Sequence, residues 1–151
     1  MLVAGGEALR LWGVRHIGVI SRTRSDRLGP LVETGPFALV RNPLYIGNIG
    51  LWTGFALAAR LVWLAPIVAG LLALEYHAIV SWEERLLASR LGDAYLAYQG
   101  RVQRWIPAAR RPPSPPLAAP AGSWRGAVFS ERGTLIAIAA GCLLLWATAR
   151  S

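Results

Sequence analysis

Charged and apolar residues are separated into long blocks along this chain, and three apolar blocks predict helices within a membrane. The first covers residues 44–59 without a charge, and the second covers 61–82 with one, Glu75. The third covers residues 133–149 and has no charge. A helix that spans a bilayer needs about 20 apolar residues, with a lower limit near 17. The second block therefore predicts a span, while the first and third are of marginal length.

The first two blocks are separated by a single charged residue, Arg60, which predicts a tight helical hairpin with Arg60 at its tip. Gly50, Gly54 and Ala58 recur at every fourth position of the first block. Small residues at this spacing predict that another helix packs closely against that face. Residues 8–20 are a further, shorter candidate for a membrane helix.

Residues 83–106 show a different pattern, in which apolar residues recur every three to four positions with arginines beside them. This pattern predicts an amphipathic helix that lies against the hairpin or on the membrane surface. Ser81 and Glu84 have the spacing of a capping box, which favours a helix that begins there. In the alternative interpretation, the Glu83 and Glu84 carboxylates bind hydroxyls, an amine or a cation.

A proline-rich segment divides the chain. Residues 112–123 contain five prolines and no charge, a composition typical of a stiff linker. The sequence therefore predicts a membrane core at 1–110, a linker at 111–123 and a C-terminal transmembrane helix at 124–151.

The chain has a net charge of +8, and all 16 of its basic residues are arginine. Such a charge suits nucleic acid or an anionic membrane surface. The hydrophobic content of 54% favours the bilayer and argues against nucleic acid. The single cysteine, Cys142, lies in an apolar run, so neither a disulfide framework nor a zinc site is predicted.

The arginines also predict an orientation. Twelve of them flank the two ends of the hairpin, whereas Arg60 and Arg150 fall on the opposite side. Under the positive-inside rule, the arginine-rich side faces the cytoplasm. Glu75 would then lie inside the membrane, where it either faces a polar pocket or is protonated or bonded to a neighbouring helix.

A group of polar residues is predicted to converge at the cytoplasmic ends of the hairpin. Pro43 is well placed to start a helix, whose first N–H groups are free to bind a ligand. Tyr45 adds a hydroxyl one turn later, and Arg41 precedes the helix. The hairpin returns Glu83 and Glu84 to the same edge. Such a patch offers both signs of charge and would suit a zwitterionic ligand with a carboxylate, an ammonium and sugar hydroxyls.

The stretch "GPFALVRNPLYIG" at 35–47, a hydrophobic hairpin, and then "EERLL…GDAYLAYQGRVQRWIP" resemble the isoprenylcysteine carboxyl methyltransferase and phospholipid methyltransferase superfamily. The resemblance covers residues 31–107. The matching positions are Arg41, Pro43, Tyr45, Gly47, Glu83, Glu84, Gly92, Tyr95, Tyr98, Arg101, Val102 and Pro107. Asn42 stands where the superfamily usually has histidine, and an amide can donate a hydrogen bond there but cannot titrate.

The resemblance implies an all-α integral membrane protein in which the hairpin and a cytoplasmic amphipathic helix form an interfacial pocket for S-adenosylmethionine, with an extra C-terminal transmembrane helix. It implies methyl transfer to a lipidic acceptor, either an isoprenylcysteine-like carboxylate or a phospholipid amine, that enters from the bilayer. Glu84 and Arg101 would be catalytic, with Arg101 orienting the acceptor. The implied cofactor-binding residues are Arg41, Asn42, Pro43, Leu44, Tyr45, Gly47, Glu83, Glu84 and Tyr98.

Two other functions fit the same motifs. Membrane sterol-type reductases carry a related Arg-x-Pro-x-Tyr-x-Gly stretch and bind NADPH. A non-catalytic membrane anchor or partner protein is the third possibility. The expected location is a bacterial inner membrane with the site facing the cytoplasm, and a homo-oligomer would be compatible with the sequence.

Overall fold

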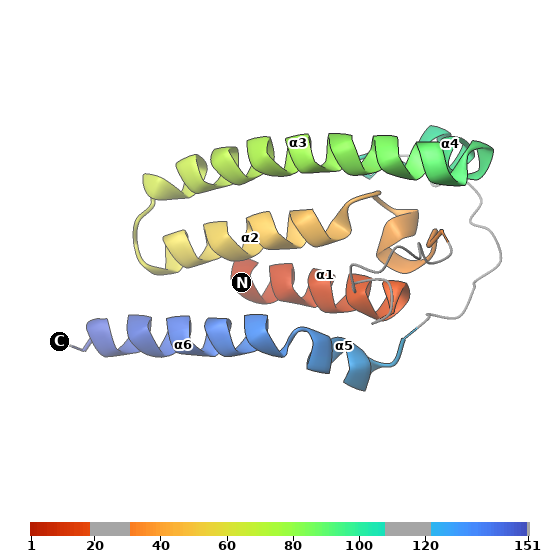
Figure 1. Ribbon diagram of the computed structural model, residues 1–151. Helices are drawn as coiled ribbons and strands as arrows, with labels where there is room; N and C mark the ends of the chain where they lie inside the picture. The colour runs from red at the N-terminus through yellow and green to blue at the C-terminus, as the bar shows by residue number, and fades with distance from the viewer. Residues whose placement is uncertain (19–30, 108–121, 151) are drawn as a thin grey trace.

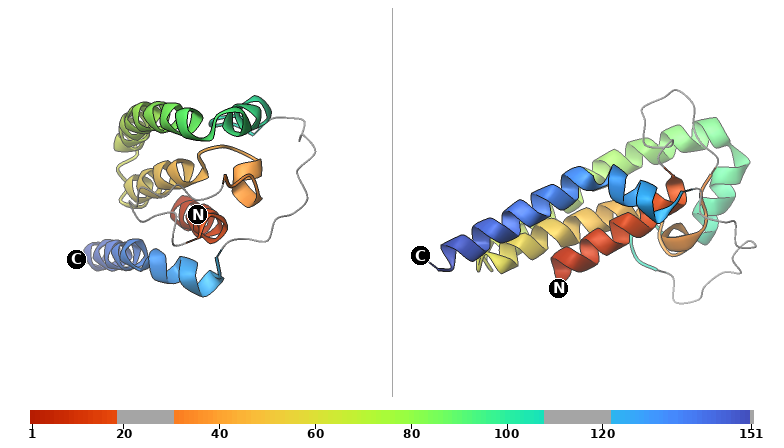
Figure 2. Two further views of the ribbon diagram at one scale, coloured as in Figure 1. Left: turned by 45° about the vertical axis from the view of Figure 1, so that its right-hand side comes forward. Right: turned by 90° about the horizontal axis from the view of Figure 1, so that it is seen from below.

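A computed structural model describes residues 1–18, 31–107 and 122–150, and within these ranges the chain is helical and contains no strand. In chain order, the elements are α1 (Leu2–Ile17), the 3-10 helix η2 (Gly35–Ala38), α2 (Pro43–Ala58), α3 (Leu64–Leu91), α4 (Asp93–Arg101), α5 (Trp124–Ser130) and α6 (Arg132–Thr148). The long helices lie roughly along one direction, with α2 between α1 and α3 (Figures 1 and 2). The all-α prediction is confirmed.

The predicted hairpin is formed by α2 and α3. Pro43 is the first residue of α2, where its missing N–H costs no hydrogen bond. At the other end, Arg60 adopts a left-handed backbone with φ of 60°, and the Leu61 N–H donates to the Ala56 carbonyl at 3.0 Å. Arg60 is exposed at the tip of the turn, as the sequence predicted.

The end of α3 differs from the prediction. This helix has 28 residues, so it is about 42 Å long and exceeds a hydrocarbon core of about 30 Å. Glu83 and Glu84 lie inside it, so the separate amphipathic helix over 83–106 and the capping box at Ser81 were wrong. Nothing between Trp82 and Leu91 breaks a helix. The break comes at Gly92, whose φ of 56° favours glycine.

The three predicted spans are not equivalent. Among the described residues, α3 is the one helix that is long and apolar enough to cross a membrane by itself. The helices α5 and α6 are long and apolar enough to cross a membrane only when taken together, and there is a bend of 63° between them. At 16 residues, α2 is shorter than the roughly 20 residues that a span needs.

Glycines bring α1 and α2 into close contact. A Cβ atom on Gly6 would lie 2.5 Å from the Gly47 carbonyl oxygen, and one on Gly54 would lie 2.7 Å from the Val3 nitrogen. These neighbours are backbone atoms, which cannot move aside. The predicted close packing on the small-residue face of α2 is therefore confirmed, and its partner is the N-terminal helix α1.

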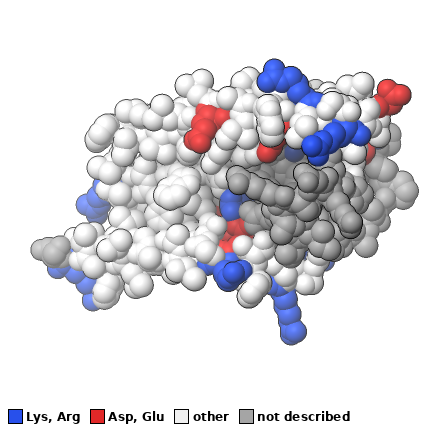
Figure 3. Space-filling model, in the orientation of Figure 1, with Lys and Arg blue, Asp and Glu red and all other residues white. Residues whose placement is uncertain are grey.

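The outer face of α3 remains apolar and exposed. Leu71 and Leu74 are 64% and 72% exposed, and Glu75 is exposed beside them. In Figure 3, charged side chains on the visible face are sparse along the middle of α3 and more frequent toward the end where α4 and α5 lie. The structure therefore does not place Glu75 in a polar pocket, which was one of the two alternatives predicted for it.

Candidate functional site

Two arginines enclose the carboxylate of Glu84, which is 5% exposed. The Arg41 Nε atom donates to Glu84 Oε1 at 3.0 Å, and Arg104 Nη2 donates to Glu84 Oε2 at 2.6 Å. Arg41 Nη1 also donates to the carbonyls of Gln99 at 3.0 Å and Val102 at 2.9 Å. Arg41 therefore joins the start of α2 to the end of α3 and to the segment that follows α4.

A second polar connection joins α2 to α3. The Tyr45 hydroxyl donates to Glu83 Oε1 at 3.0 Å, and the Tyr45 and Tyr76 rings lie 4.7 Å apart between centroids. One turn further along α2, the Asn48 amide donates to the Tyr76 hydroxyl at 3.2 Å. The consecutive residues Glu83 and Glu84 thus have different surroundings. The first binds a phenol, and the second binds two guanidinium groups.

These contacts border a hollow of about 610 Å³ between α1, η2, the start of α2 and the end of α3. Its volume lies within the usual range of small-molecule sites, about 300–1,000 Å³. Its walls combine aromatic, aliphatic and polar side chains from these four elements. They are Arg10, Ile17, Phe37, Arg41, Asn42, Pro43, Leu44, Tyr45, Asn48, Trp82, Glu83, Leu86 and Leu87.

A buried ionic cluster on α1 forms the inner edge of this hollow. Arg10 is 7% exposed, its Nε atom lies 3.3 Å from Glu7 Oε2, and its guanidinium donates to Glu131 and to Asn48. Arg10 also lies 3.4 Å from the Thr134 hydroxyl. This cluster fastens α1 to α2 and to the junction of α5 and α6.

The family to which this architecture belongs is settled by comparison with known proteins. Residues 1–94 match the family described as phospholipid methyltransferase. The chain belongs to this family. The superfamily resemblance seen in the sequence is thereby confirmed. The matched region contains Arg41, Tyr45, Glu83 and Glu84, and it ends before Arg104 and before α5 and α6.

Two curated relatives are metal-resistance proteins by name. The chain is 34% identical over 98 residues to the nickel-cobalt-cadmium resistance protein NccN of Alcaligenes xylosoxydans xylosoxydans, an alignment that covers 65% of this chain and 43% of NccN. It is 31% identical over 98 residues to the cobalt-zinc-cadmium resistance protein CzcN of Cupriavidus metallidurans, covering 65% of this chain and 42% of CzcN. The chain thus spans less than half the length of these relatives. No solved structure matches it.

Tyr98 and Arg101 lie apart from the hollow that this family member forms. The Tyr98 hydroxyl donates to the Phe37 carbonyl at 2.8 Å, and burial raises the pKa of the phenol. Arg101 is exposed and donates to Glu33 Oε2 at 2.5 Å. Tyr98 therefore holds η2 through its hydrogen bond to Phe37, and Arg101 lies on the exposed side of α4.

The structure brings together most, but not all, of the predicted cofactor residues. Those that line the hollow are Arg41, Asn42, Pro43, Leu44, Tyr45 and Glu83. Gly47, Glu84 and Tyr98 do not line the hollow, and neither does Arg101, which was predicted as catalytic. Gly47 instead packs against Gly6, where a Cβ on Gly47 would lie 2.7 Å from the Gly6 carbonyl oxygen.

Sequence reasoning missed the roles of Arg10, Glu7 and Arg104. Glu7 and Arg10 carried a usable signal, because two opposite charges three positions apart in an apolar helix are expected to pair. Arg104 carried none. Its contact with Glu84 depends on the direction in which the chain returns after Gly92.

Proposed function

We propose that this chain forms the core of an integral-membrane methyltransferase that transfers a methyl group from S-adenosylmethionine to a lipid or small hydrophobic acceptor. The observation that carries the proposal is the hollow at the ends of α2 and α3. It places the Glu83 carboxylate, held by Tyr45, opposite apolar and aromatic walls in a member of the phospholipid methyltransferase family.

The residues of the hollow fit the chemical groups of this cofactor. Glu83 can accept hydrogen bonds from an ammonium group or from ribose hydroxyls, and the Asn42 amide can donate to a carboxylate. Phe37 and Trp82 provide aromatic surface for a purine. When bound, the cofactor supplies an electrophilic methyl group on a sulfonium. The residues of this chain contribute position and exclusion of water.

The position of Glu83 along α3 suits a reaction between a soluble and a membrane-bound reactant. Glu83 lies 19 residues after Leu64, which is about 29 Å along the helix axis and close to the thickness of a hydrocarbon core. The hollow would therefore open at the membrane boundary. A soluble cofactor reaches it from the water, and an apolar acceptor reaches it from the lipid.

The same arrangement supports an inner-membrane location with the hollow on the cytoplasmic side. The end of the structure that carries the hollow also carries Arg85, Arg90 and Arg104, while Arg60 lies at the far turn. Under the positive-inside rule this end faces the cytoplasm.

In this proposal Glu83 contacts the cofactor, while Glu84 acts through other residues. Glu84 is enclosed by Arg41 and Arg104, so its carboxylate positions the backbone around Asn42 rather than a ligand. Arg101 remains a prediction for orienting the acceptor, and its partner Glu33 would have to release it.

Metal handling, suggested by the names of the relatives, has no support from the described residues. Among residues 1–18, 31–107 and 122–150, no group of three His, Cys, Asp or Glu side chains is arranged to hold a metal ion.

The proposal is tested by titrating the purified full chain with S-adenosylmethionine and, separately, with NADPH, in a calorimeter. We expect binding of S-adenosylmethionine and a loss of about tenfold in affinity for Glu83→Gln, because hydrogen bonds to a charged group contribute roughly 1.5–3 kcal/mol. Glu75→Gln is the matched control, since Glu75 is an exposed carboxylate on the same helix. Binding of NADPH alone would favour a reductase, and binding of neither would leave a membrane anchor.

The acceptor is found by a second experiment. Membranes that contain the chain are incubated with methyl-labelled S-adenosylmethionine, and the label is extracted with the lipids. We expect a labelled lipid in membranes with the wild-type chain and, at a cofactor concentration below saturation, less labelled lipid with Glu83→Gln.

A further inference from the structure

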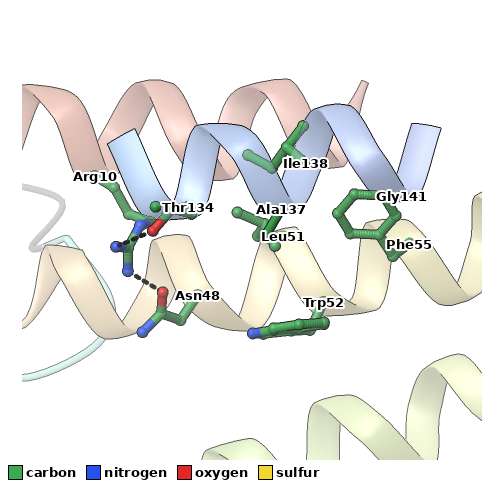
Figure 4. A pocket seen from close by; sticks show the side chains of 10 residues that line it. Arg10, Asn48, Leu51, Trp52, Phe55, Thr134, Ala137, Ile138 and Gly141 are labelled. Atoms are coloured by element: carbon green, nitrogen blue, oxygen red, sulfur yellow. Dashed lines mark hydrogen bonds between the residues drawn. The ribbon is translucent and has the colours of Figure 1, made fainter. Parts of the chain in front are cut away.

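A second cavity lies between α2 and α6 (Figure 4). Its volume is about 370 Å³, and its long walls are apolar. The polar side chains gather at one end, where Arg10, Asn48 and Thr134 meet, while Phe55 and Gly141 lie at the other end. We name this cavity the α2–α6 groove. Its shape and polarity suit a molecule with one polar end and one hydrocarbon end.

The groove meets the hollow that is proposed for the cofactor. Arg10 and Asn48 line both cavities. Because Arg10 donates to the Asn48 side chain, this pair forms the boundary between the polar hollow and the apolar groove. A molecule whose tail occupies the groove would have its head at this boundary, next to the hollow.

The wall formed by α6 lies outside the part of the chain that matches the family, which ends at residue 94. Glu131, which directly precedes α6 and is 1% exposed, binds Arg10 of α1. This contact joins the start of α6 to α1. Thr134 adds a longer contact to the same guanidinium, at 3.4 Å. The C-terminal helix is therefore attached at the polar end of the groove.

We propose that the α2–α6 groove holds the single hydrocarbon chain of the methyl acceptor, with its polar head at Arg10 and Asn48. That the bound molecule is the methyl acceptor rests on the proposed function, whereas the binding of a linear amphiphile in the groove is independent of it. Continuity with the hollow, apolar walls and a polar end all favour this occupant over an apolar helix, because a helix would leave Arg10 and Asn48 facing aliphatic surface.

Phe55 and Gly141 set the length of chain that the groove accepts. A Cβ atom on Gly141 would lie 2.8 Å from Cε1 of Phe55, so the aromatic ring closes the space against the α6 backbone. Removing the ring opens the far end of the groove, and a larger residue at Gly141 fills it. These two residues are thus specificity-determining and do not touch the hollow.

The test uses the purified full chain and photoreactive straight-chain fatty acids of decanoic, myristic and stearic length. After irradiation, adducts are mapped by mass spectrometry. We expect adducts on both walls of the groove, around Phe55 in α2 and Ile138 in α6, that excess unlabelled fatty acid removes. Adducts confined to the exposed face of α3 at Leu71 and Leu74 would overturn the proposal, since they would report detergent-like coating.

Variants sharpen the result. Gly141→Leu should lower groove labelling by at least about tenfold, because even one methylene group too many in an apolar pocket lowers binding by roughly 10–200-fold. Gly70→Leu is the matched control, as a Cβ there meets nothing within 4 Å. Phe55→Ala should shift the chain-length preference of labelling toward the stearic probe. An unchanged preference would show that Phe55 does not limit the length of the bound chain. The Phe55→Ala variant also keeps the test valid if Gly141→Leu fails to fold.

The outcomes for the two proposals can be separated. Labelling of the groove needs no S-adenosylmethionine. Groove adducts without binding of S-adenosylmethionine would support the amphiphile site and refute the methyltransferase proposal. Binding of S-adenosylmethionine without groove adducts would support the methyltransferase proposal and refute the amphiphile site.

Discussion

The Nε atom of Arg41 lies 3.0 Å from Oε1 of Glu84, although 43 positions separate the two residues in the chain. The contact joins the residue just before the first hairpin helix to the far part of the second. Because Arg104 approaches the same carboxylate from beyond α4, three segments meet at one buried charge. The adjacent Glu83 is then held beside Tyr45 and faces the hollow.

This relationship predicts different consequences for the two neighbouring glutamates. Glu84→Gln should lower the free energy of unfolding by about 3 kcal/mol, because it leaves two guanidinium groups without their shared carboxylate. Glu83→Gln should leave unfolding nearly unchanged. Denaturant midpoints of the purified chain without ligand measure both. Equal midpoints for the two variants would contradict the structural role of Glu84.

Tyr45→Phe should weaken cofactor binding while it retains the fold. The variant keeps the aromatic ring against Tyr76 but loses the hydroxyl that donates to Glu83 at 3.0 Å. We expect affinity for S-adenosylmethionine to fall several-fold and stability to fall by about 1 kcal/mol. Calorimetric titration checks the first value. Tyr95→Phe, on α4 outside the hollow, is the control, and a comparable loss of affinity there would contradict the assignment.

Adjacent glycines in α1 should respond in opposite ways. A Cβ on Gly6 would meet the backbone of α2 at 2.5 Å, whereas one on Gly5 meets nothing within 4 Å. Gly6→Ala should therefore destabilise the chain by about 1–3 kcal/mol through overpacking. Gly5→Ala should be neutral or stabilising by up to about 1 kcal/mol, because alanine favours a helix. The midpoints of thermal unfolding of the two variants, measured side by side, check this prediction. An unchanged midpoint for Gly6→Ala would refute the close crossing of α1 and α2.

Stability should fall at high pH through Tyr98. Burial raises the pKa of its phenol above the usual value of about 10, so the unfolded chain loses this proton first. The stabilisation is complete below about pH 10 and is lost as the pH rises through the folded-state pKa. Midpoints measured on both sides of the usual phenol pKa should therefore fall in the wild type and fall less in Tyr98→Phe. Tyr95, whose pKa burial also raises, accounts for a residual slope.

Local patterns predicted the parts of the fold that local physics determines. The apolar block at 44–59 and the proline at 43 anticipated α2, and the block at 133–149 anticipated α6. The convergence of Arg41 with Glu84 also followed, because a hairpin must return to the side that it left. These predictions needed only periodicity, helix-starting residues and topology.

The remaining errors arose where distant contacts outweigh the local signal. Ser81 and Glu84 have the spacing of a cap, yet the helix continues because no residue there interrupts its hydrogen bonds. The contact of Arg104 with Glu84 could not be predicted from spacing, since φ at Gly92 sets the direction of α4. The link between Arg10 and Glu131 spans 121 positions, and no periodic pattern reports such a pair.

The hydrogen bonds of Arg41 have a consequence for the biosynthesis of the protein. Its side chain binds the carbonyls of Gln99 and Val102, and its N–H binds the carbonyl of Gln103 at 2.9 Å. Both hairpin helices are synthesised before these acceptors exist. The contacts that hold Arg41 are therefore complete only after the segment that follows α4 has been synthesised.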